Sequence, residues 1–220
     1  IIQRIRFTHG LGIRMFQISL PSWGALDASE AQQFFQTVCG AFPDSRFLHY
    51  NLPRTKRVLN GADYRRLIDA VPNLVATKNG GGLQRANDLM THAAQLQHFF
   101  DEYTFPHGCL RGECSLLSSF GPMSPHKTKA FFEAGCRADV GLLFQLQQEV
   151  HLMAQDVLGP LMEEDRIDGA YDKLLVRLSG LEDMPLRLLS PYQCFTEEQY
   201  QTAKQVLHER YTEWLPEGTC

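Results

Sequence analysis

Short apolar runs alternate with helical patterns along the first 120 residues, and this alternation constrains the fold more than any other feature. Five runs have the composition of β-strands, at residues 14–20, 46–52, 73–77, 98–105 and 114–120. The first three begin at intervals of about thirty residues, the length of a β/α/β unit. Strands joined in this way form a parallel sheet, so the sequence predicts an α/β fold.

Helix signals fill the stretches between the runs. Asp27 followed by Glu30 is typical of a capping box, and apolar residues continue on one face of the helix it opens. Two more helices are predicted over residues 61–71 and 83–96. Only a very short helix fits between the fourth and fifth runs.

After Pro125 the pattern becomes entirely helical. Helices are predicted over residues 138–158, 161–178 and 196–214, the last opened by a capping box of Thr196 and Gln199. We therefore expect two regions, residues 1–125 with the sheet and residues 126–220 with helices only.

Composition excludes several classes of function. The chain has 220 residues, 44% of them hydrophobic, which suits one sizeable core, and a net charge of −4 with no long basic run, which gives no sign of nucleic-acid binding. No apolar run reaches the roughly 18–20 residues that a membrane-spanning helix needs. The six cysteines are scattered, as free thiols of a cytoplasmic protein are.

Motifs for nucleotides and metals are missing or weak. No G-x-G-x-x-G opens a helix, and the glycines at residues 80–82 are not followed by the G-K-[ST] of a P-loop. One cluster could bind a metal through thiols and imidazoles, but its spacing is not that of a zinc site; it consists of His107, Cys109, Cys114 and His126. We predict no metal and no cofactor, and keep a metal protein as an alternative.

The third run ends on a lysine and three glycines. Lys78 directly follows an apolar strand, and Gly80 to Gly82 leave space beside it. Lys78 is either a solvated strand end before a turn or an amine at the mouth of a pocket. Its neighbours in the sequence alone do not decide between the two.

Two segments of this chain resemble a known family. "LHYNLPRT", with Tyr50, is followed one β/α unit later by "PNLVATKNGGG", with Lys78. These segments are similar to the ends of barrel strands five and six in the pyruvate-dependent class I aldolases, the dihydrodipicolinate synthase and N-acetylneuraminate lyase family. Residues 14–23 then resemble strand four, and residues 114–125 resemble strand eight.

The resemblance implies a (β/α)8 TIM barrel with a C-terminal helical extension. This chain would supply strands four to eight and would lack about the first three β/α units, roughly eighty to ninety residues. The family's Gly-Thr-Thr motif has no counterpart here. Strands four to eight alone would leave an open sheet edge.

The resemblance also implies a reaction and its residues. Lys78 would form a Schiff base with pyruvate or a related 2-oxo acid, and a carbon–carbon bond to an aldehyde would then be made or broken. Tyr50 would shuttle protons, and Gly80 and Gly82 would leave room for the substrate. The family also uses an arginine for a second carboxylate, matched by Arg54 or its neighbour Arg57, and a strand-eight backbone for the keto-acid carboxylate, matched at Leu117.

Departures from the family weaken any assignment of the substrate. "FFDEYTFPHG" stands where strand seven usually has Gly-Asp-(Asp/Glu), Asn79 replaces an acid, and Ser22 and Trp23 replace two tyrosines of the synthase. A divergent lyase fits better than dihydrodipicolinate synthase itself. A barrel that lost or changed catalysis and serves as a sensor or scaffold is the second class.

A homodimer or homotetramer is also expected. The family commonly assembles as tetramers, and the helix of residues 138–158 carries an apolar stripe that one side of a barrel would not cover. The stripe consists of Leu142, Leu146, Val150 and Met153.

Overall fold

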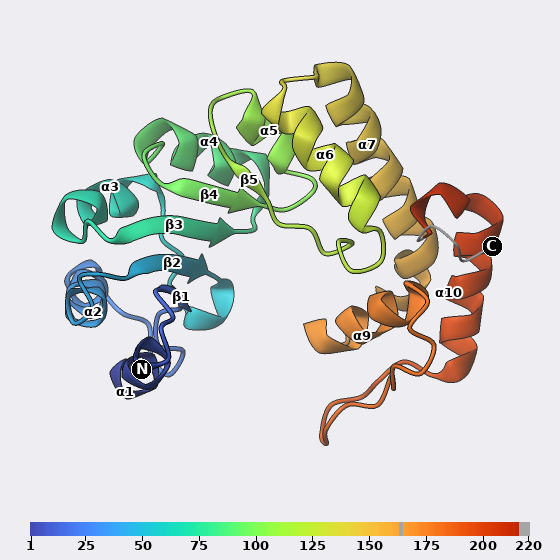
Figure 1. The fold of residues 1–220 in the computed structure, drawn as a ribbon, viewed down its shortest axis with the longest axis horizontal. Coiled ribbons are helices and arrows are strands. Elements are labelled where there is room, and N and C mark those ends of the chain that lie inside the picture. Colours follow the sequence, from blue (N-terminus) through green and yellow to red (C-terminus); the bar gives the residue numbers. More distant parts are fainter. Residues whose placement is uncertain (163–164, 216–220) are drawn as a thin grey trace. The chain divides into compact units, whose positions relative to one another are not determined.

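A five-stranded parallel sheet organises the first part of the chain in the computed structural model, which describes residues 1–162 and 165–215. Its strands lie side by side in chain order, and each neighbouring pair is parallel. All five carboxyl ends therefore reach the same edge of the sheet (Figure 1). This confirms the five predicted strands, which are β1 Met15–Ile18, β2 Arg46–Asn51, β3 Leu74–Asn79, β4 Gln97–Phe100 and β5 Ser115–Leu116.

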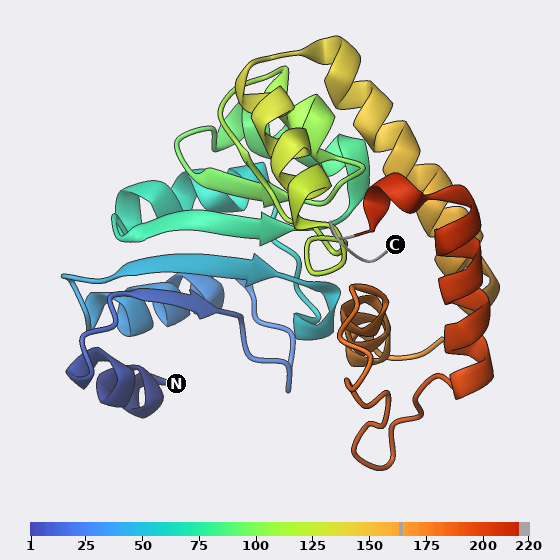
Figure 2. The ribbon, with the colours of Figure 1, turned by 45° about the vertical axis from the view of Figure 1, so that its right-hand side comes forward.

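Helices connect successive strands and cover one side of the sheet. α2, α3 and α4 lie on that side (Figure 2), and residues of the strands alternate accordingly between buried and more exposed positions. Phe47, His49 and Asn51 of β2 are buried, whereas Leu48 and Tyr50 are only half-buried. The helices of this part are α1 Ile2–Gly10, α2 Ala28–Gly40, α3 Gly61–Ala70, α4 Gly82–His92 and the short α5 Phe105–Cys109, with the 3-10 turn η1 Pro53–Thr55.

Capping boxes fix where several helices begin. Both predicted boxes are confirmed, with Asp27 and Glu30 at the start of α2 and Thr196 and Gln199 at the start of α10 (Glu197–Arg210). Each pairs two backbone N–H groups that would otherwise lack a partner. A third box, in which Asn60 caps α3, was not predicted.

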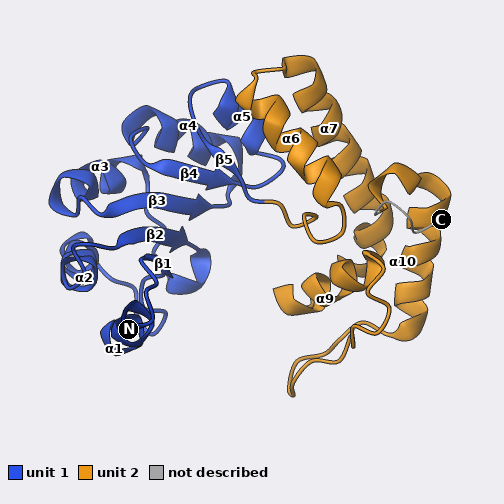
Figure 3. Ribbon diagram, viewed as in Figure 1, with its two compact units in different colours: residues 1–117 blue, residues 118–220 orange. Residues whose placement is uncertain are grey.

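The second part of the chain is helical, as predicted. Two compact units divide the chain at residues 117 and 118 (Figure 3), and the expected division at residue 125 stays a prediction. The second unit contains α6 Pro125–Cys136, α7 Val140–Met153, the π-helical turn η2 Ala154–Leu158, α8 Gly159–Met162, α9 Asp168–Leu178, α10 Glu197–Arg210 and the 3-10 turn η3 Thr212–Trp214.

Several predicted elements differ in extent; the helix expected over residues 196–214, for example, is α10 followed by the separate turn η3. The helix expected over residues 161–178 is wrong as one element, because residues 165–167 are not helical and Asp165 has a φ of 44°; residues 163 and 164 lie outside the described chain. β4 ends at Phe100, since Asp101 starts a turn in which its carboxylate accepts a hydrogen bond from the Thr104 N–H. β5 is only two residues long.

The apolar stripe of α7 does not require a partner subunit to bury it. Leu146, Val150 and Met153 are buried within the chain itself, and Leu142 is half-buried. The argument from this stripe is therefore wrong, and a homo-oligomer stays a prediction. Across residues 1–162 and 165–215, no helix combines the length and the apolar character that crossing a membrane requires.

A buried histidine joins the sheet to its covering helices. His49 of β2 is fully buried, with Nδ1 2.7 Å from the hydroxyl of Tyr64 on α3 and its ring packed edge-on against Phe35 on α2. Among the residues that the structure describes, its Nε2 has no hydrogen-bond partner. Burial lowers the pKa of His49 from 6.5 to about 3, so the imidazole is neutral in the folded protein.

This burial predicts a loss of stability in acid. Between pH 6.5 and about 3 the unfolded chain binds a proton at residue 49 that the folded chain does not bind. The free energy of unfolding should be unaffected by His49 above pH 6.5 and fall below it, by up to about 1.4 kcal/mol per pH unit. Burial lowers the pKa of His98 as well, so His98 adds to the fall. Urea unfolding at several pH values measures the slope.

His49→Asn separates the contribution of residue 49. Asparagine keeps a hydrogen-bond acceptor but does not titrate, so the slope should become shallower than in the wild type. The matched substitution His92→Asn, at an exposed residue of α4, should leave the slope unchanged. Equal slopes for His49→Asn and wild type would contradict the interpretation.

Candidate active site

Tyr50 and Lys78 are brought together by the pairing of β2 and β3. They are direct partners across the two strands, one residue from the carboxyl end of each. Lys78 Nζ lies 3.8 Å from the centroid of the Tyr50 ring, in a cation–π contact. Both side chains are half-buried. The structure thus joins the two residues that the sequence selected.

An irregularity in β3 decides which face carries the lysine. Phe47 pairs with Leu74 but Leu48 pairs with Ala76, so Val75 is an extra residue. Side chains alternate between the faces of a strand, and an uninterrupted register would place Lys78 opposite Asn51, on the helix-covered face. The extra residue places it instead on the face of Tyr50. Bulges of this kind often re-aim a side chain next to a functional site.

The lysine shares its face with polar and half-buried groups. Lys78 pairs with Phe99 of β4, which in turn pairs with Ser115 of β5. Gln97, on the same face, donates a hydrogen bond to the Ser115 hydroxyl at 2.9 Å. These three neighbours are half-buried, as is Lys78 itself, so this face of the sheet is partly accessible to solvent.

The glycines after Lys78 allow an unusual backbone conformation and also leave space beside the lysine. Gly81 and Gly82 have φ values of 111° and 76°, in the region where a side chain strains the backbone. Gly80 is exposed, and a Cβ added there would have Asp101 Oδ2, at 3.8 Å, as its nearest contact. The segment therefore turns sharply from β3 into α4 and leaves the strand end open.

Asp101 is a residue of this edge that the sequence prediction missed. It follows β4 directly, and β4 pairs with β3 so that Asn79 lies opposite Phe100. Its Oδ1 accepts a hydrogen bond from the Thr104 N–H at 2.9 Å, which holds the carboxylate beside Gly80. An acid immediately after a strand was the available signal, but residues 101–105 were assigned to the strand itself.

A chain of buried hydrogen bonds lies on the opposite face of the same strand ends. Asn51 Nδ2 donates to Asn79 Oδ1 at 3.0 Å, and Asn79 Nδ2 donates to the Thr77 hydroxyl at 2.6 Å. Thr77 Oγ1 lies 2.6 Å from His98 Nδ1, and His98 Nε2 lies 2.9 Å from the Ala93 carbonyl. Because a carbonyl only accepts, Nε2 carries the proton and Nδ1 accepts from the threonine.

The same amide of Asn51 also fixes the loop after β2. Its Nδ2 donates to the Leu59 carbonyl at 2.8 Å, and its Oδ1 accepts from the Leu59 N–H at 2.9 Å. Asn51 and Asn79, the residues next to Tyr50 and Lys78, are thus hydrogen-bonded to each other and to neighbouring groups. This network holds the two proposed catalytic side chains in register.

The predicted substrate-binding residues are less well placed. Arg54 lies in η1 and is exposed. Its alternative, Arg57, donates to the Leu26 carbonyl and forms an ion pair with Asp63 at 3.2 Å, so it anchors the loop before α3. The Leu117 N–H donates to the Phe100 carbonyl at 2.7 Å, so this amide is already used within the sheet. Carboxylate binding at these residues stays a prediction.

The metal alternative gains no support from the geometry. Among the residues that the structure describes, no three His, Cys, Asp or Glu side chains are grouped as metal ligands. Cys109 and Cys114 lie in contact, with Sγ atoms 3.6 Å apart, but His126 Nε2 is 2.9 Å from the Glu213 carbonyl. Cys220, the sixth cysteine, lies outside the described residues.

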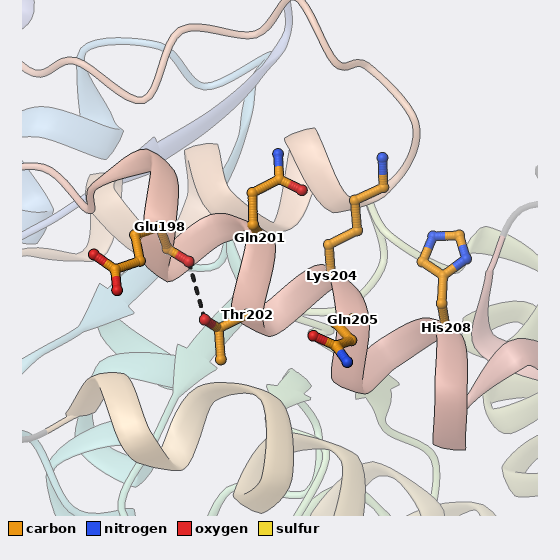
Figure 4. A pocket seen from close by; sticks show the side chains of 6 residues that line it. All are labelled: Glu198, Gln201, Thr202, Lys204, Gln205 and His208. Carbon is orange, nitrogen blue, oxygen red and sulfur yellow. Dashed lines mark hydrogen bonds between the residues drawn. The ribbon is translucent and has the colours of Figure 1, made fainter.

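A separate hollow on α10 does not resemble an enclosed binding site. Its volume is about 630 Å³, and only side chains of this one helix line it. Figure 4 shows them spreading along the helix, with the Thr202 hydroxyl donating to the Glu198 carbonyl. An open polar helix surface of this kind offers none of the convergent groups that the β2–β3 edge provides.

Comparison with known proteins adds information about the fold. No protein-family model matches the sequence. No curated protein matches it either.

Solved structures do match. N-acetylneuraminate lyase from Fusobacterium nucleatum has a TM-score of 0.78 at 13% identity, covering 98% of this chain and 70% of that chain. A prophage protein of the dihydrodipicolinic acid synthase family from E. coli K12, in complex with pyruvate, has a TM-score of 0.77 at 17% identity, covering 94% and 70%. A dihydrodipicolinate synthase described as the first monomeric variant has a TM-score of 0.80 at 13% identity, covering 94% and 69%.

These similarities show a shared fold. The parallel sheet and its helices correspond to part of the TIM barrel of the dihydrodipicolinate synthase and N-acetylneuraminate lyase structures. The chain spans 70% of the length of several of them. The fold and the structural resemblance expected from the sequence are thereby confirmed.

The buried hydrogen-bond network predicts that removing the Thr77 hydroxyl lowers the stability of the fold. Thr77→Val keeps the shape of the side chain but leaves His98 Nδ1 and Asn79 Nδ2 without this partner. We expect the free energy of unfolding to fall by about 1–3 kcal/mol, measured by urea denaturation. Thr202→Val, at an exposed residue whose hydroxyl donates to the Glu198 carbonyl of its own helix, is the matched control and should stay within about 0.5 kcal/mol of wild type. A similarly small change for Thr77→Val would show that the network does not hold the strand ends.

Proposed function

We propose that this chain carries the Schiff-base centre of a lyase or aldolase that acts on pyruvate or a related 2-oxo acid and an aldehyde. The observation that carries the proposal is the pairing of Tyr50 with Lys78 on one face, at the carboxyl ends of β2 and β3. Active sites of TIM-barrel enzymes lie at this end of the strands. The similarity in fold to a family protein crystallised with pyruvate supports the choice of substrate class.

The proposed reaction begins at the lysine amine. Neutral Lys78 Nζ adds to the C2 carbonyl of the 2-oxo acid, and the carbinolamine loses water to give a protonated imine. The positive nitrogen withdraws electrons, so a C3 proton can leave and the resulting enamine can add to an aldehyde. The reverse sequence cleaves the same carbon–carbon bond. Water then releases the product and restores the amine.

Tyr50 is the proposed proton carrier. A phenol both donates and accepts hydrogen bonds, which suits the departure of water from the carbinolamine and proton transfer at the aldehyde oxygen. Its ring already contacts the amine, so substrate bound to Lys78 would lie within reach of the same residue. The open strand end at Gly80 and the carboxylate of Asp101 complete the surroundings of the amine.

A role in binding without turnover is the second candidate. In its favour, the ammonium lies over the face of the Tyr50 ring, an arrangement that holds a cation without needing the hydroxyl. Such a protein would serve as a sensor or scaffold for a 2-oxo acid. For either role we propose a cytoplasmic homodimer or homotetramer, with free thiols suited to a reducing compartment.

Chemical trapping tests the lysine directly. Borohydride reduces an imine to a stable secondary amine, so treatment with pyruvate and borohydride should add a lactyl-type mass to Lys78. A modified lysine resists trypsin, and the added mass should appear on the peptide of residues 67–85. Lys78→Ala should abolish trapping and turnover, whereas Lys129→Ala, at an exposed lysine of α6, should change neither.

Two outcomes would refute the proposed centre. One is an adduct that forms on a different lysine in the folded protein. The other is the absence of any adduct with a panel of 2-oxo acids while Lys78→Ala and wild type unfold at the same urea concentration.

Tyr50→Phe distinguishes a lyase from a binding protein. The substitution removes only the hydroxyl, so the ring contact with Lys78 and the stability should persist, within about 1–1.5 kcal/mol. If the phenol carries protons, turnover should fall roughly 10²–10⁴-fold while slow imine trapping at Lys78 survives. Turnover within about threefold of wild type would exclude the proton-carrying role. A wild type that forms the imine but converts no aldehyde would favour the sensor.

A further inference from the structure

Two cysteines touch in the connection between β4 and β5. Cys109 is the last residue of α5, and Cys114 directly precedes β5. Their Sγ atoms lie 3.6 Å apart. Cys114 is buried, with 7% of its surface exposed, whereas Cys109 is half-buried and reaches the surface.

Core packing holds the two sulfurs together. Gly108 lies against β4, where an added Cβ would come within 2.8 Å of the Phe100 ring and 3.0 Å of Cys114 Sγ. Only glycine permits this approach of α5, and Phe100 itself is buried. The thiol contact therefore belongs to the packing of α5 on the sheet, while the intervening residues 110–113 are exposed.

We propose that Cys109 and Cys114 form a reversible dithiol–disulfide site whose oxidant is a peroxide. The Cys109 thiolate attacks one peroxide oxygen, so an S–O bond forms, the O–O bond breaks and hydroxide leaves. The Cys114 sulfur then attacks the Cys109 sulfur, the S–S bond forms, and the sulfenic oxygen leaves with the Cys114 proton as water. The two thiols together lose two electrons, and hydrogen peroxide is reduced to two molecules of water.

The environments of the two thiols assign their roles. The hydrogen bond from Cys114 lowers the pKa of the Cys109 thiol, and Cys109 is also the more accessible of the pair. By contrast, burial raises the pKa of Cys39 to about 12, which makes that thiol unreactive. Cys109 is thus the attacking residue and Cys114 the resolving one.

Disulfide formation requires little movement. A disulfide has an S–S bond of about 2.05 Å, so the sulfurs must approach each other by about 1.5 Å. The exposed residues 110–113 can absorb this shift without disturbing the core. The inference does not depend on imine chemistry at Lys78, since no step involves that residue.

Arg111 makes the test simple, because trypsin cuts between the two cysteines. They fall into the peptides of residues 86–111 and 112–127, which a disulfide would join. Brief treatment of the folded protein with hydrogen peroxide should give this joined pair, lighter by two hydrogen atoms, and dithiothreitol should separate it. Cys109→Ser and Cys114→Ser should abolish the joined pair, whereas Cys136→Ser, at an exposed cysteine, should leave it unchanged.

A comparison in wild type alone guards against variants that fail to fold. In the folded protein the sulfurs are already in contact, so the pair should join at least about tenfold faster than in concentrated urea. Equal rates of disulfide formation in both conditions would show that the fold does not bring the two thiols together, and would contradict the proposal. So would sulfinic or sulfonic acid at Cys109 together with a free Cys114, or joining through Cys136 or Cys194 instead.

Discussion

The extra residue in β3 is the constraint on which the proposed site depends. Val75 shifts the pairing of β2 and β3 by one position, and this shift turns Lys78 from the helix-covered face to the face of Tyr50. The buried hydrogen bonds from Asn51 through Asn79 to Thr77 then hold the shifted register at the strand ends. The hydrogen bonds lie on the helix-covered face of these strands, and the amine of Lys78 lies on the other face.

Much of the fold could be predicted from the sequence because its signals are local. The spacing of apolar runs predicted all five strands, and Asp27 with Glu30 marked the start of α2 correctly. The predictions were wrong where a turn ends a strand or where contacts between distant residues bury a surface. The Asp101–Thr104 turn ends β4 early, and most of the stripe of α7 is buried within the chain itself, which periodicity alone does not reveal.

The site was predictable only in part, for the same reason. Lys78 stands out through its place at a strand end, and Tyr50 through the resemblance to a known family, but the bulge that puts them on one face leaves no mark in the apolar pattern. The network around Thr77 links residues far apart in the chain, so no window of sequence contains it. The thiol pair was visible as a motif, and its contact became evident only with the packing of Gly108 on Phe100.

The central claim is that Lys78 activates a 2-oxo acid as an enamine, and proton exchange at its methyl group reports this without any knowledge of the aldehyde. Pyruvate incubated with the protein in heavy water can be followed by proton NMR. The account predicts that the methyl signal of pyruvate decays through deuterium incorporation much faster with wild type than in buffer, and that Lys78→Ala reduces the decay to the buffer rate. Decay at the buffer rate with folded wild type, or equal decay with Lys78→Ala, would contradict it.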